Sequence, residues 1–315
     1  GYWVPVLETT VPAGAFSAHR HAGQSAPAGH RGVTERWFHE TLYPDFRQSL
    51  YIEEILFEGR TAFQDAVIFR NPRFGRVLTL DGVVQTTEKD EFCYHEMIAH
   101  VPMVAHGAAR RVLIIGGGDG GVLREALKHP LEAAVMIELD ETVVNICREH
   151  MPTLSAGAFD HPRADLRFMD GIKFVAETDE RFDVIIVDST DPIGPGEVLF
   201  TPEFYGDCAR CLTEKGILVT QSGVTFMQDG EAAGTYQRMK SLFTDASLYI
   251  TQVPTYAAGF MTFGWGCHSI EPRRTPVDEI TRRVAQLDLK TRYYSPAIHT
   301  AGFALPGYVE ILIRD

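Results

Sequence analysis

The stretch Ile114–Gly121, with the sequence IIGGGDGG, decides the fold class of this 315-residue chain. An apolar run precedes it, and a helical pattern, Val122–His129, follows it. Gly116, Gly118 and Gly121 match the pattern G-x-G-x-x-G, in which glycines let the backbone turn tightly and approach a nucleotide. The stretch therefore predicts a Rossmann-like nucleoside site, although a glycine-rich turn with a purely structural role could have the same sequence.

Apolar runs alternate with helical patterns on the carboxyl side of this stretch. Short, fully apolar strands between helices indicate parallel βαβ units with both faces of the sheet covered. We expect a helix over Glu91–His100 that Pro102 ends or restarts, and an added strand pair, Tyr249–Val253 with Met261–Trp265. Residues 90–315 are thus predicted to form an α/β domain.

Residues 34–89 have a β pattern instead. Asp81-Gly82 separates two β-rich runs, Arg76–Leu80 and Val83–Thr87, which is a strong hairpin signal. We therefore expect a small antiparallel β-domain before the α/β domain. Residues 1–33 are rich in Ala and Gly and carry no chemistry that we can name, so we interpret them as a peripheral extension or a tag.

Composition narrows the class of protein. The chain has 29 basic and 42 acidic side chains, a formal charge of −13, and 45% hydrophobic residues. It is therefore neither disordered nor a disulfide scaffold, and its acidity argues against nucleic acid and favours a cationic ligand. No apolar run approaches 18 residues, so no membrane helix is expected. Five cysteines form a sparse, odd set, which indicates a reduced, cytoplasmic protein.

Three carboxylates are placed to contact a nucleoside ligand. Glu138 ends the next predicted strand, where it can bind both ribose hydroxyls. Asp119 lies inside the glycine loop and would repel a pyrophosphate, so a sulfonium ligand fits better than a dinucleotide. Asp170, before Gly171, can accept a hydrogen bond from an adenine amino group. Each has a structural alternative: Asp119 could hold the turn, Asp170 could cap a helix, and Glu138 could lie on the surface.

The segment Asp188–Glu197, with the sequence DSTDPIGPGE, carries the strongest local signal. It follows a buried strand and places two carboxylates, Asp188 and Asp191, before a segment rich in Pro and Gly that could close as a lid. Either aspartate could instead begin a turn. Together with Asp119 they predict an acidic cleft, and such a cluster is costly unless it binds a metal or an organic cation. The motifs supply no further metal ligands, so we expect an organic cation.

Other residues that could carry chemistry have structural interpretations. His95 and His100 would lie about 140° apart around a helix, so we reject a zinc site. Cys208 and Cys211 suit core packing, and a pair such as Glu125 with Lys128 suits a solvated helix face.

The sequence resembles the polyamine aminopropyltransferases, most closely the bacterial spermidine synthases, over about residues 36–315. The resemblance rests on long motifs in order, namely Phe63–Asp65, Leu80–Phe92, Tyr94–Met97, Gly116–Gly121 with Leu123–Glu125, Asp188–Glu197, Pro254–Tyr256 and Tyr293–Ala301. It implies a small N-terminal β-domain, a methyltransferase-like Rossmann domain, and a homodimer or homotetramer. It also implies transfer of an aminopropyl group from decarboxylated S-adenosylmethionine to putrescine, which gives spermidine and methylthioadenosine, without a metal or a permanently bound cofactor.

The resemblance further implies a role for each matching residue. Asp188 would be the proton acceptor, and its loop would close as a gate. The nucleoside of the donor would be held by Gln64, Gly116, Gly118, Asp119, Glu138, Asp170, Gly171 and Pro195. The aminopropyl ammonium and the diamine would be held by Asp119, Asp188, Ser189, Thr190, Asp191, Gln85, Tyr94, His95 and Tyr256. Two alternatives stay open: a small-molecule N-methyltransferase that uses S-adenosylmethionine, and a non-catalytic polyamine- or nucleoside-binding protein.

Overall fold

The computed structural model describes residues 35–190 and 201–314. The described residues from Arg36 onward belong to one compact unit, which contains both the predicted β-domain and the predicted α/β domain. Within the described residues, no helix has the length and apolarity that crossing a membrane requires.

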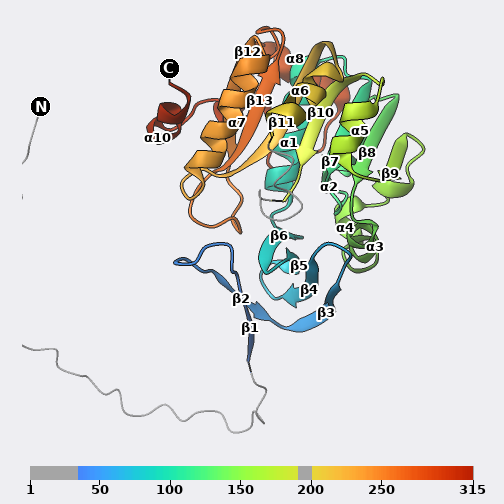
Figure 1. The fold of residues 1–315 in the computed structure, drawn as a ribbon, viewed down its shortest axis with the longest axis vertical. Helices are drawn as coiled ribbons and strands as arrows, with labels where there is room; N and C mark the ends of the chain where they lie inside the picture. Colours follow the sequence, from blue (N-terminus) through green and yellow to red (C-terminus); the bar gives the residue numbers. More distant parts are fainter. Residues whose placement is uncertain (1–34, 191–200, 315) are drawn as a thin grey trace, which may run out of the picture. The chain divides into compact units, whose positions relative to one another are not determined.

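The centre of the fold is a seven-stranded sheet with the order β12-β13-β11-β10-β7-β8-β9 (Figure 1). Five neighbouring strands are parallel, and β12 and β13 form an antiparallel pair at one edge, so the predicted added strand pair is confirmed. The strands are β7 (Arg111–Gly116), β8 (Ala133–Glu138), β9 (Ala164–Phe168), β10 (Phe182–Asp188), β11 (Leu212–Val224), β12 (Asp245–Thr251) and β13 (Met261–Cys267). The chain passes outward from β7 to β9 and returns to β10 on the other side of β7. A crevice for ligands is expected at such a reversal.

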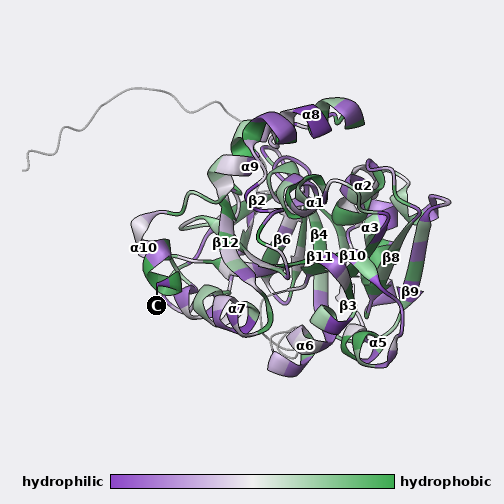
Figure 2. Ribbon diagram, turned by 90° about the horizontal axis from the view of Figure 1, so that it is seen from above, coloured by the Kyte–Doolittle hydropathy of each residue, from purple (hydrophilic) through white to green (hydrophobic). Residues whose placement is uncertain are grey.

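Helices cover both faces of this sheet (Figure 2). Alternate side chains of the strands pack against α1 (Phe92–His106), α2 (Gly121–Leu127) and α8 (Val277–Leu287) on one face. The other alternate side chains pack against α5 (Gly171–Glu177), α6 (Pro202–Arg210) and α7 (Asp229–Leu242) on the opposite face. The remaining helices are α3 (Glu141–His150), α4 (Pro152–Ser155), α9 (Pro296–Gly302) and α10 (Gly307–Glu310), with 3-10 turns η1 (Ala158–Asp160) and η3 (Ile311–Ile313).

Helix α1 continues through Pro102, so the prediction that this proline ends or restarts the helix was wrong. A proline inside a helix costs about 3 kcal/mol because it removes one hydrogen bond and crowds the preceding turn. Thirteen consecutive residues of α1, Cys93–Ala105, are buried in the core. Burial of a large apolar side chain contributes about 1.5–3 kcal/mol, so packing on every side of the helix outweighs the proline.

The N-terminal part of the described chain is antiparallel β-structure, as predicted. The strands β3 (Glu54–Arg60), β4 (Asp65–Asn71), β5 (Gly75–Leu80) and β6 (Val83–Thr87) form one sheet, and β1 (Arg36–His39) pairs with β2 (Ser49–Ile52). Asp81 and Gly82 have φ of 47° and 77°, the left-handed pair that a two-residue hairpin requires. Apolar side chains of β4 and β5 pack against α3, which fixes this sheet beside the central one.

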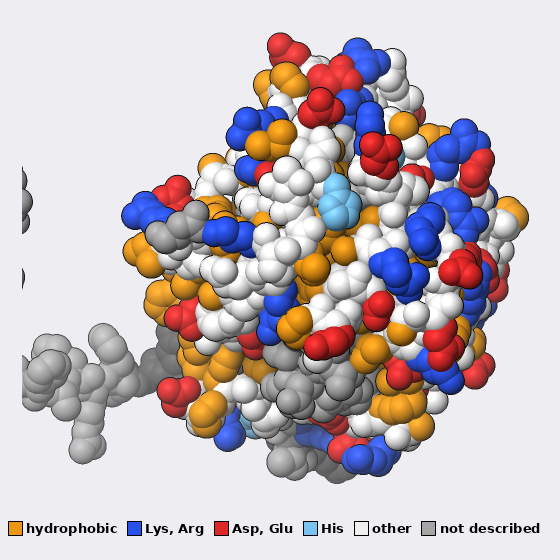
Figure 3. All heavy atoms as spheres, turned by 45° about the horizontal axis from the view of Figure 1, so that its top comes forward, with side chains coloured by type: hydrophobic (Ala, Val, Ile, Leu, Met, Phe, Trp, Pro, Cys, Tyr) orange, Lys and Arg blue, Asp and Glu red, His pale blue; other side chains and the backbone are white. Residues whose placement is uncertain are grey.

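The surface has no strong segregation of charge on the side that Figure 3 shows, where acidic and basic side chains are interspersed. All five cysteines are buried. Cys208 and Cys211 belong to the core that α6 forms with the sheet, so the interpretation as packing residues is confirmed.

Candidate active site

A cavity of about 500 Å³ lies at the carboxyl ends of β7 and β10, and the N-terminal sheet supplies its other wall. The structure brings together nearly all the residues that the sequence singled out. Those that line the cavity are Gln64, Gln85, Tyr94, His95, Gly116, Gly118, Asp119, Glu138, Asp170, Gly171, Asp188, Ser189, Thr190 and Tyr256. Asp191 and Pro195 lie outside the described residues.

The glycine loop brings β7 and β10 into close contact. Gly116 has φ of 84°, and a Cβ there would lie 2.2 Å from the backbone oxygen of Asp188. The next residue, Gly117, donates its N–H to that same oxygen over 3.0 Å. Only glycine allows this approach, so the loop places Asp188 directly beside the turn that the sequence predicted for a nucleoside.

Glu138 ends β8 at the wall of the cavity. Its Oε1 accepts a hydrogen bond from the N–H of Asp140 over 2.9 Å. Burial, with Asp140 nearby, raises the pKa of Glu138 to about 7. At pH 7 the carboxyl group of Glu138 is therefore only partly ionised. Its oxygens can accept hydrogen bonds from the hydroxyls of a ribose.

Asp170 caps helix α5 and also lines the cavity. Its Oδ1 accepts the N–H of Ile172 over 2.8 Å. The helix-capping alternative is therefore confirmed. It does not remove Asp170 from the cavity, to whose wall the following Gly171 also contributes.

Asp188 ends β10 and accepts a hydrogen bond from the hydroxyl of Tyr94, with 2.6 Å between Tyr94 Oη and Asp188 Oδ1. Burial and the neighbouring Asp119 raise the pKa of Asp188 to about 6. The next residues, Ser189 and Thr190, continue the cavity wall, and Gln221 donates to the carbonyl of Thr190 over 3.2 Å. Asp188 can therefore be ionised at pH 7 and still accept a proton with a moderate affinity.

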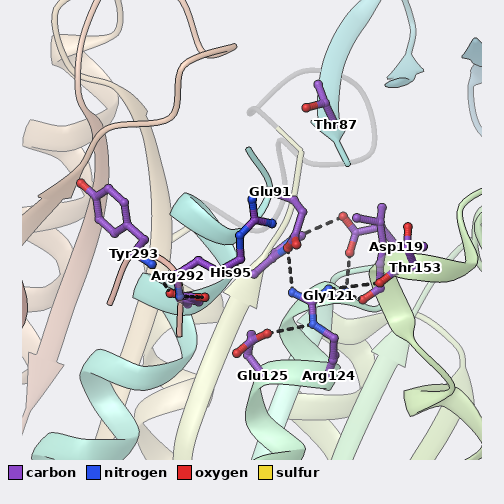
Figure 4. A network of polar contacts seen from close by, with 12 residues as sticks. Thr87, Glu91, His95, Asp119, Gly121, Arg124, Glu125, Thr153, Arg292 and Tyr293 are labelled. Carbon is purple, nitrogen blue, oxygen red and sulfur yellow. Dashed lines mark hydrogen bonds and ion pairs between the residues drawn. The ribbon is translucent and has the colours of Figure 1, made fainter. Parts of the chain in front are cut away.

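Asp119 has two partners (Figure 4). Its Oδ1 accepts the N–H of Gly121 over 2.7 Å, so the turn-holding alternative is confirmed. Its Oδ2 lies 3.3 Å from Nε2 of His95, and Nδ1 of His95 lies 2.7 Å from Oε2 of Glu91. A Cβ on Gly121 would overlap the His95 ring, so the loop also needs glycine there for this packing.

Aromatic side chains enclose the part of the cavity next to Asp188. The ring centroids of Tyr94 and Tyr256 are 6.0 Å apart in an edge-to-face arrangement. The hydroxyl of Tyr256 donates to the carbonyl of Gln85 over 2.5 Å, which joins this wall to β6. A cation between such rings and a carboxylate gains both ring and charge attraction.

Two residues that support the site from behind its wall were missed by the sequence reasoning. Glu91 and Arg124 were quoted only within motifs, yet Arg124 donates to Glu91 over 2.7 Å, and Glu91 holds His95. The signal was present, because Glu91 and His95 are four residues apart on a helix and face each other. The interpretation of Glu125 as a solvated residue was wrong: its side chain is 1% exposed, between His100 and Lys128.

The fold and this cavity define a class of protein. A Rossmann-like sheet with a glycine loop, a carboxylate at the end of the second strand and an acidic, aromatic compartment is an arrangement for a nucleoside that carries a cationic arm. Across residues 35–190 and 201–314, no group of three or more His, Cys, Asp or Glu is arranged to hold a metal ion.

Comparisons with known proteins give the family. A family model described as "Spermine/spermidine synthase domain" matches residues 91–273, and one described as "Spermidine synthase tetramerisation domain" matches residues 36–88. Polyamine aminopropyltransferase of Ruegeria sp. is 54% identical over 279 residues, which cover 88% of this chain and 98% of that protein. Polyamine aminopropyltransferase 1 of Pseudomonas aeruginosa is 56% identical over 273 residues, 86% of this chain and 96% of that protein.

Solved structures agree with these relatives. A spermidine synthase in complex with the transition-state analogue AdoDATO superposes with a TM-score of 0.84 at 37% identity, over 90% of this chain and 98% of that one. The spermidine synthase of Thermotoga maritima superposes with a TM-score of 0.81 at 35% identity, over 90% and 97%. The chain belongs to the spermine/spermidine synthase family, the polyamine aminopropyltransferases. The predicted family, the fold class and the expectation of an enzyme are thereby confirmed.

Proposed function

We propose that this chain transfers the aminopropyl group of decarboxylated S-adenosylmethionine to putrescine, giving spermidine and methylthioadenosine. The observation that carries the proposal is the placement of Asp119 and Asp188 at the glycine loop, where one cavity combines nucleoside recognition with negative charge. A donor with a sulfonium and a terminal ammonium complements that charge, and so does a diamine acceptor.

The nucleoside would bind along the carboxyl ends of β7, β8 and β9. Glu138 would accept hydrogen bonds from the ribose hydroxyls, and Gly116 and Gly118 would let the backbone approach the ligand. Asp170, Gly171 and Gln64 line the remaining wall and would bind the adenine base of the nucleoside. Pro195 completes this set by resemblance alone.

The charge of the cavity would select the donor. The aminopropyl ammonium would lie between Asp119 and Asp188. Ordinary S-adenosylmethionine carries a carboxylate at that end, and a carboxylate facing two carboxylates in a poorly hydrated cavity is strongly disfavoured. The common metabolite would therefore be excluded by repulsion.

The acceptor would lie beside the rings of Tyr94 and Tyr256, with Gln85, Ser189 and Thr190 around it and Asp191 at its distal ammonium, while His95 would act at the same wall through its contact with Asp119. Its primary amine has a pKa of about 10.4, judged by lysine, so it binds mostly protonated at pH 7. Asp188, with a pKa of about 6, is ionised there and can accept this proton.

The step itself is a displacement in line. The deprotonated nitrogen forms a bond to the methylene next to sulfur, the carbon–sulfur bond breaks, and its electron pair stays on sulfur as the neutral thioether. The proton has gone to Asp188. Moving it from an amine of pKa about 10.4 to an acid of pKa about 6 costs about 6 kcal/mol, and the adjacent sulfonium reduces this cost because it lowers the pKa of the amine.

The assembly would be a homodimer or a homotetramer. This proposal rests on the match of residues 36–88 to the family model whose description names tetramerisation. We further propose that the reaction needs neither a metal ion nor a permanently bound cofactor, since displacement at a sulfonium supplies its own leaving group.

The test is product formation by an Asp188→Asn variant. Wild-type protein with putrescine and decarboxylated S-adenosylmethionine should give equal amounts of spermidine and methylthioadenosine by mass spectrometry, and the variant should lose 10²–10⁴-fold in kcat. Asp183→Asn is a matched control, because Asp183 lies at the other end of β10, where it accepts backbone N–H groups of Arg110 and Arg111. Near-normal turnover by Asp188→Asn would remove this residue from the role of base.

A further inference from the structure

The imidazole of His95 lies between two carboxylates. Its Nδ1 is 2.7 Å from Oε2 of Glu91, and its Nε2 is 3.3 Å from Oδ2 of Asp119. The contact at Nδ1 is a hydrogen bond, and the contact at Nε2 is at ion-pair distance. A neutral ring would turn the lone pair of one nitrogen toward an ionised carboxylate, so the arrangement favours the protonated ring, in which both nitrogens carry a proton. The His95 side chain is 3% exposed, so this positive charge lies inside the protein at the wall of the cavity.

On the Glu91 side, a series of side chains with alternating charges holds this imidazolium in place (Figure 4). Arg124 donates to Glu91 over 2.7 Å and to Glu125 over 2.8 Å, and a third hydrogen bond, to the carbonyl of Leu154 over 2.6 Å, fixes its guanidinium. Glu125, in turn, lies 2.6 Å from Nζ of Lys128. Three hydrogen bonds fix the guanidinium of Arg124. Glu91 therefore cannot turn away from His95 without breaking its ion pair with Arg124.

The charged and polar groups near His95 come from four elements. Glu91 and Tyr94 are on α1 or at its start, Asp119 is on the loop after β7, and Asp188 ends β10, while Arg124 on α2 acts through Glu91. Burial alone would lower the pKa of His95, but Asp119 and Glu91 raise it well above its usual value. For Asp188 the balance runs the other way: burial and Asp119 raise its pKa, while the positive charge of His95 lowers it.

We propose that Glu91, fixed by Arg124, holds His95 as a permanent imidazolium, and that this cation offsets Asp119 so that Asp188 stays ionised and ready to accept a proton near neutral pH. His95, Glu91 and Arg124 are in this account positioning residues that act through Asp188. The inference rests on the proposed function, because it assumes that Asp188 is the base. It explains how two carboxylates at one cleft can coexist without one of them taking a proton at pH 7.

The first test reads the charge of His95 directly. In uniformly 13C-labelled protein, the His95 ring signals are those absent from a His95→Gln spectrum. They should stay at the imidazolium position from pH 6 to pH 9 in the wild type. In Glu91→Gln they should titrate within this range, because one of the two carboxylates is gone. Titration of wild-type His95 near its ordinary value of about 6.5 would overturn the proposal.

The second test reads the pKa of the base. In His95→Gln, Asp119 is no longer offset, so the acid limb of the pH profile of kcat/KM should move upward by about one pH unit. An acid limb that stays in place or moves downward, even with a lower rate at every pH, would mean that His95 only supports the packing.

Glu96→Gln is the matched control for Glu91→Gln. Glu96 is a buried carboxylate on the same helix, and it accepts the backbone N–H groups of Arg292, Tyr293 and Tyr294. This variant should lose stability, but its His95 signals and its acid limb should match the wild type. Wild-type protein that forms no spermidine would refute the proposed function instead, and the His95 signals would still decide whether the ring is a permanent cation.

Discussion

The proposed role of Asp188 requires an ionised side chain, and its surroundings raise the pKa of that side chain. Burial and Asp119 raise its pKa to about 6, while His95 and the hydrogen bond from Tyr94 act in the opposite direction. Tyr94 itself has a pKa well above its usual value, because of burial and the nearby Asp188, so it stays a donor throughout the physiological range. The result is a carboxylate whose affinity for a proton exceeds that of an ordinary aspartate, which suits the proton transfer proposed for it near pH 7.

The negative charge of Asp188 should lower the free energy of unfolding of the protein. The pKa of Asp188 is about 6 in the folded chain and about 3.9 when unfolded, so the ionised side chain weakens the fold by about 1–3 kcal/mol above pH 6. The folded state binds the proton more tightly, so this contribution favours folding at low pH and is lost as the pH rises from about 4 to about 6. Asp188→Asn removes it.

We therefore expect Asp188→Asn to unfold at a higher denaturant concentration than the wild type at pH 7.5, with a smaller difference at pH 4.5. Urea titrations at the two pH values measure this. A variant that is equally destabilised at both would show that the cavity does not disfavour the charge.

At the scale of elements, the junction of β7 and β10 determines the site. The two strands are neighbours in the sheet although some 70 residues separate them in the chain, and their carboxyl ends meet at Gly116 and Asp188. Residues from the hairpin of β5 and β6 then close the cavity from the other side. The site thus depends on a backbone approach that a side chain at Gly116 would block.

We expect Gly116→Ala to lose about 2–4 kcal/mol of stability, since alanine is strained at φ of 84° and its Cβ would overlap the Asp188 carbonyl. Its KM for the donor should rise because the loop must move away from β10. Gly206→Ala on α6 is the control: apart from the adjoining backbone of the helix itself, no atom lies within 4 Å of the added Cβ, and alanine favours a helix, so stability should rise slightly. Thermal unfolding and steady-state kinetics measure the two effects. A Gly116→Ala variant with the stability and the donor KM of the wild type would contradict this account of the contact between β7 and β10.

At the scale of the molecule, much of the fold could be predicted from the sequence. The glycine loop at Gly116–Gly121, the apolar strands and the Asp81-Gly82 hairpin each follow a local rule, and local rules need no knowledge of the tertiary structure. The cavity was predictable for the same reason, because carboxyl ends of parallel strands share one edge of a sheet.

What could not be predicted depends on burial. Pro102 breaks an isolated helix but not one enclosed on all sides, and Glu125 with Lys128 has the spacing of a surface pair. The spacing of Glu91 and His95 was visible in the sequence, but Arg124 looked like an ordinary charged residue, because its contact with Glu91 joins α2 to α1 and the sequence does not display it. Periodicity shows which side chains face inward only where they are apolar.

The first residues of the chain should be dispensable for the reaction. The first of the two family matches begins at residue 36 and the second at residue 91, and every described residue of the cavity lies beyond residue 36. A chain that starts at residue 34 should keep its kcat and KM within about twofold, and light scattering should give two or four times the mass of one chain with or without the extension. A large loss of activity, or a monomer, would show that the extension supports the site or the assembly.

The central claim is that Asp119 and Asp188 make this cavity select a donor with a cationic arm, and one competition measures it. Purified protein would receive putrescine with equal concentrations of decarboxylated and ordinary S-adenosylmethionine, and mass spectrometry would follow every product. The account predicts spermidine and methylthioadenosine, with no methylated putrescine. Methylated putrescine together with S-adenosylhomocysteine would contradict it, because the cavity would then accept the carboxylate that its two aspartates are proposed to exclude.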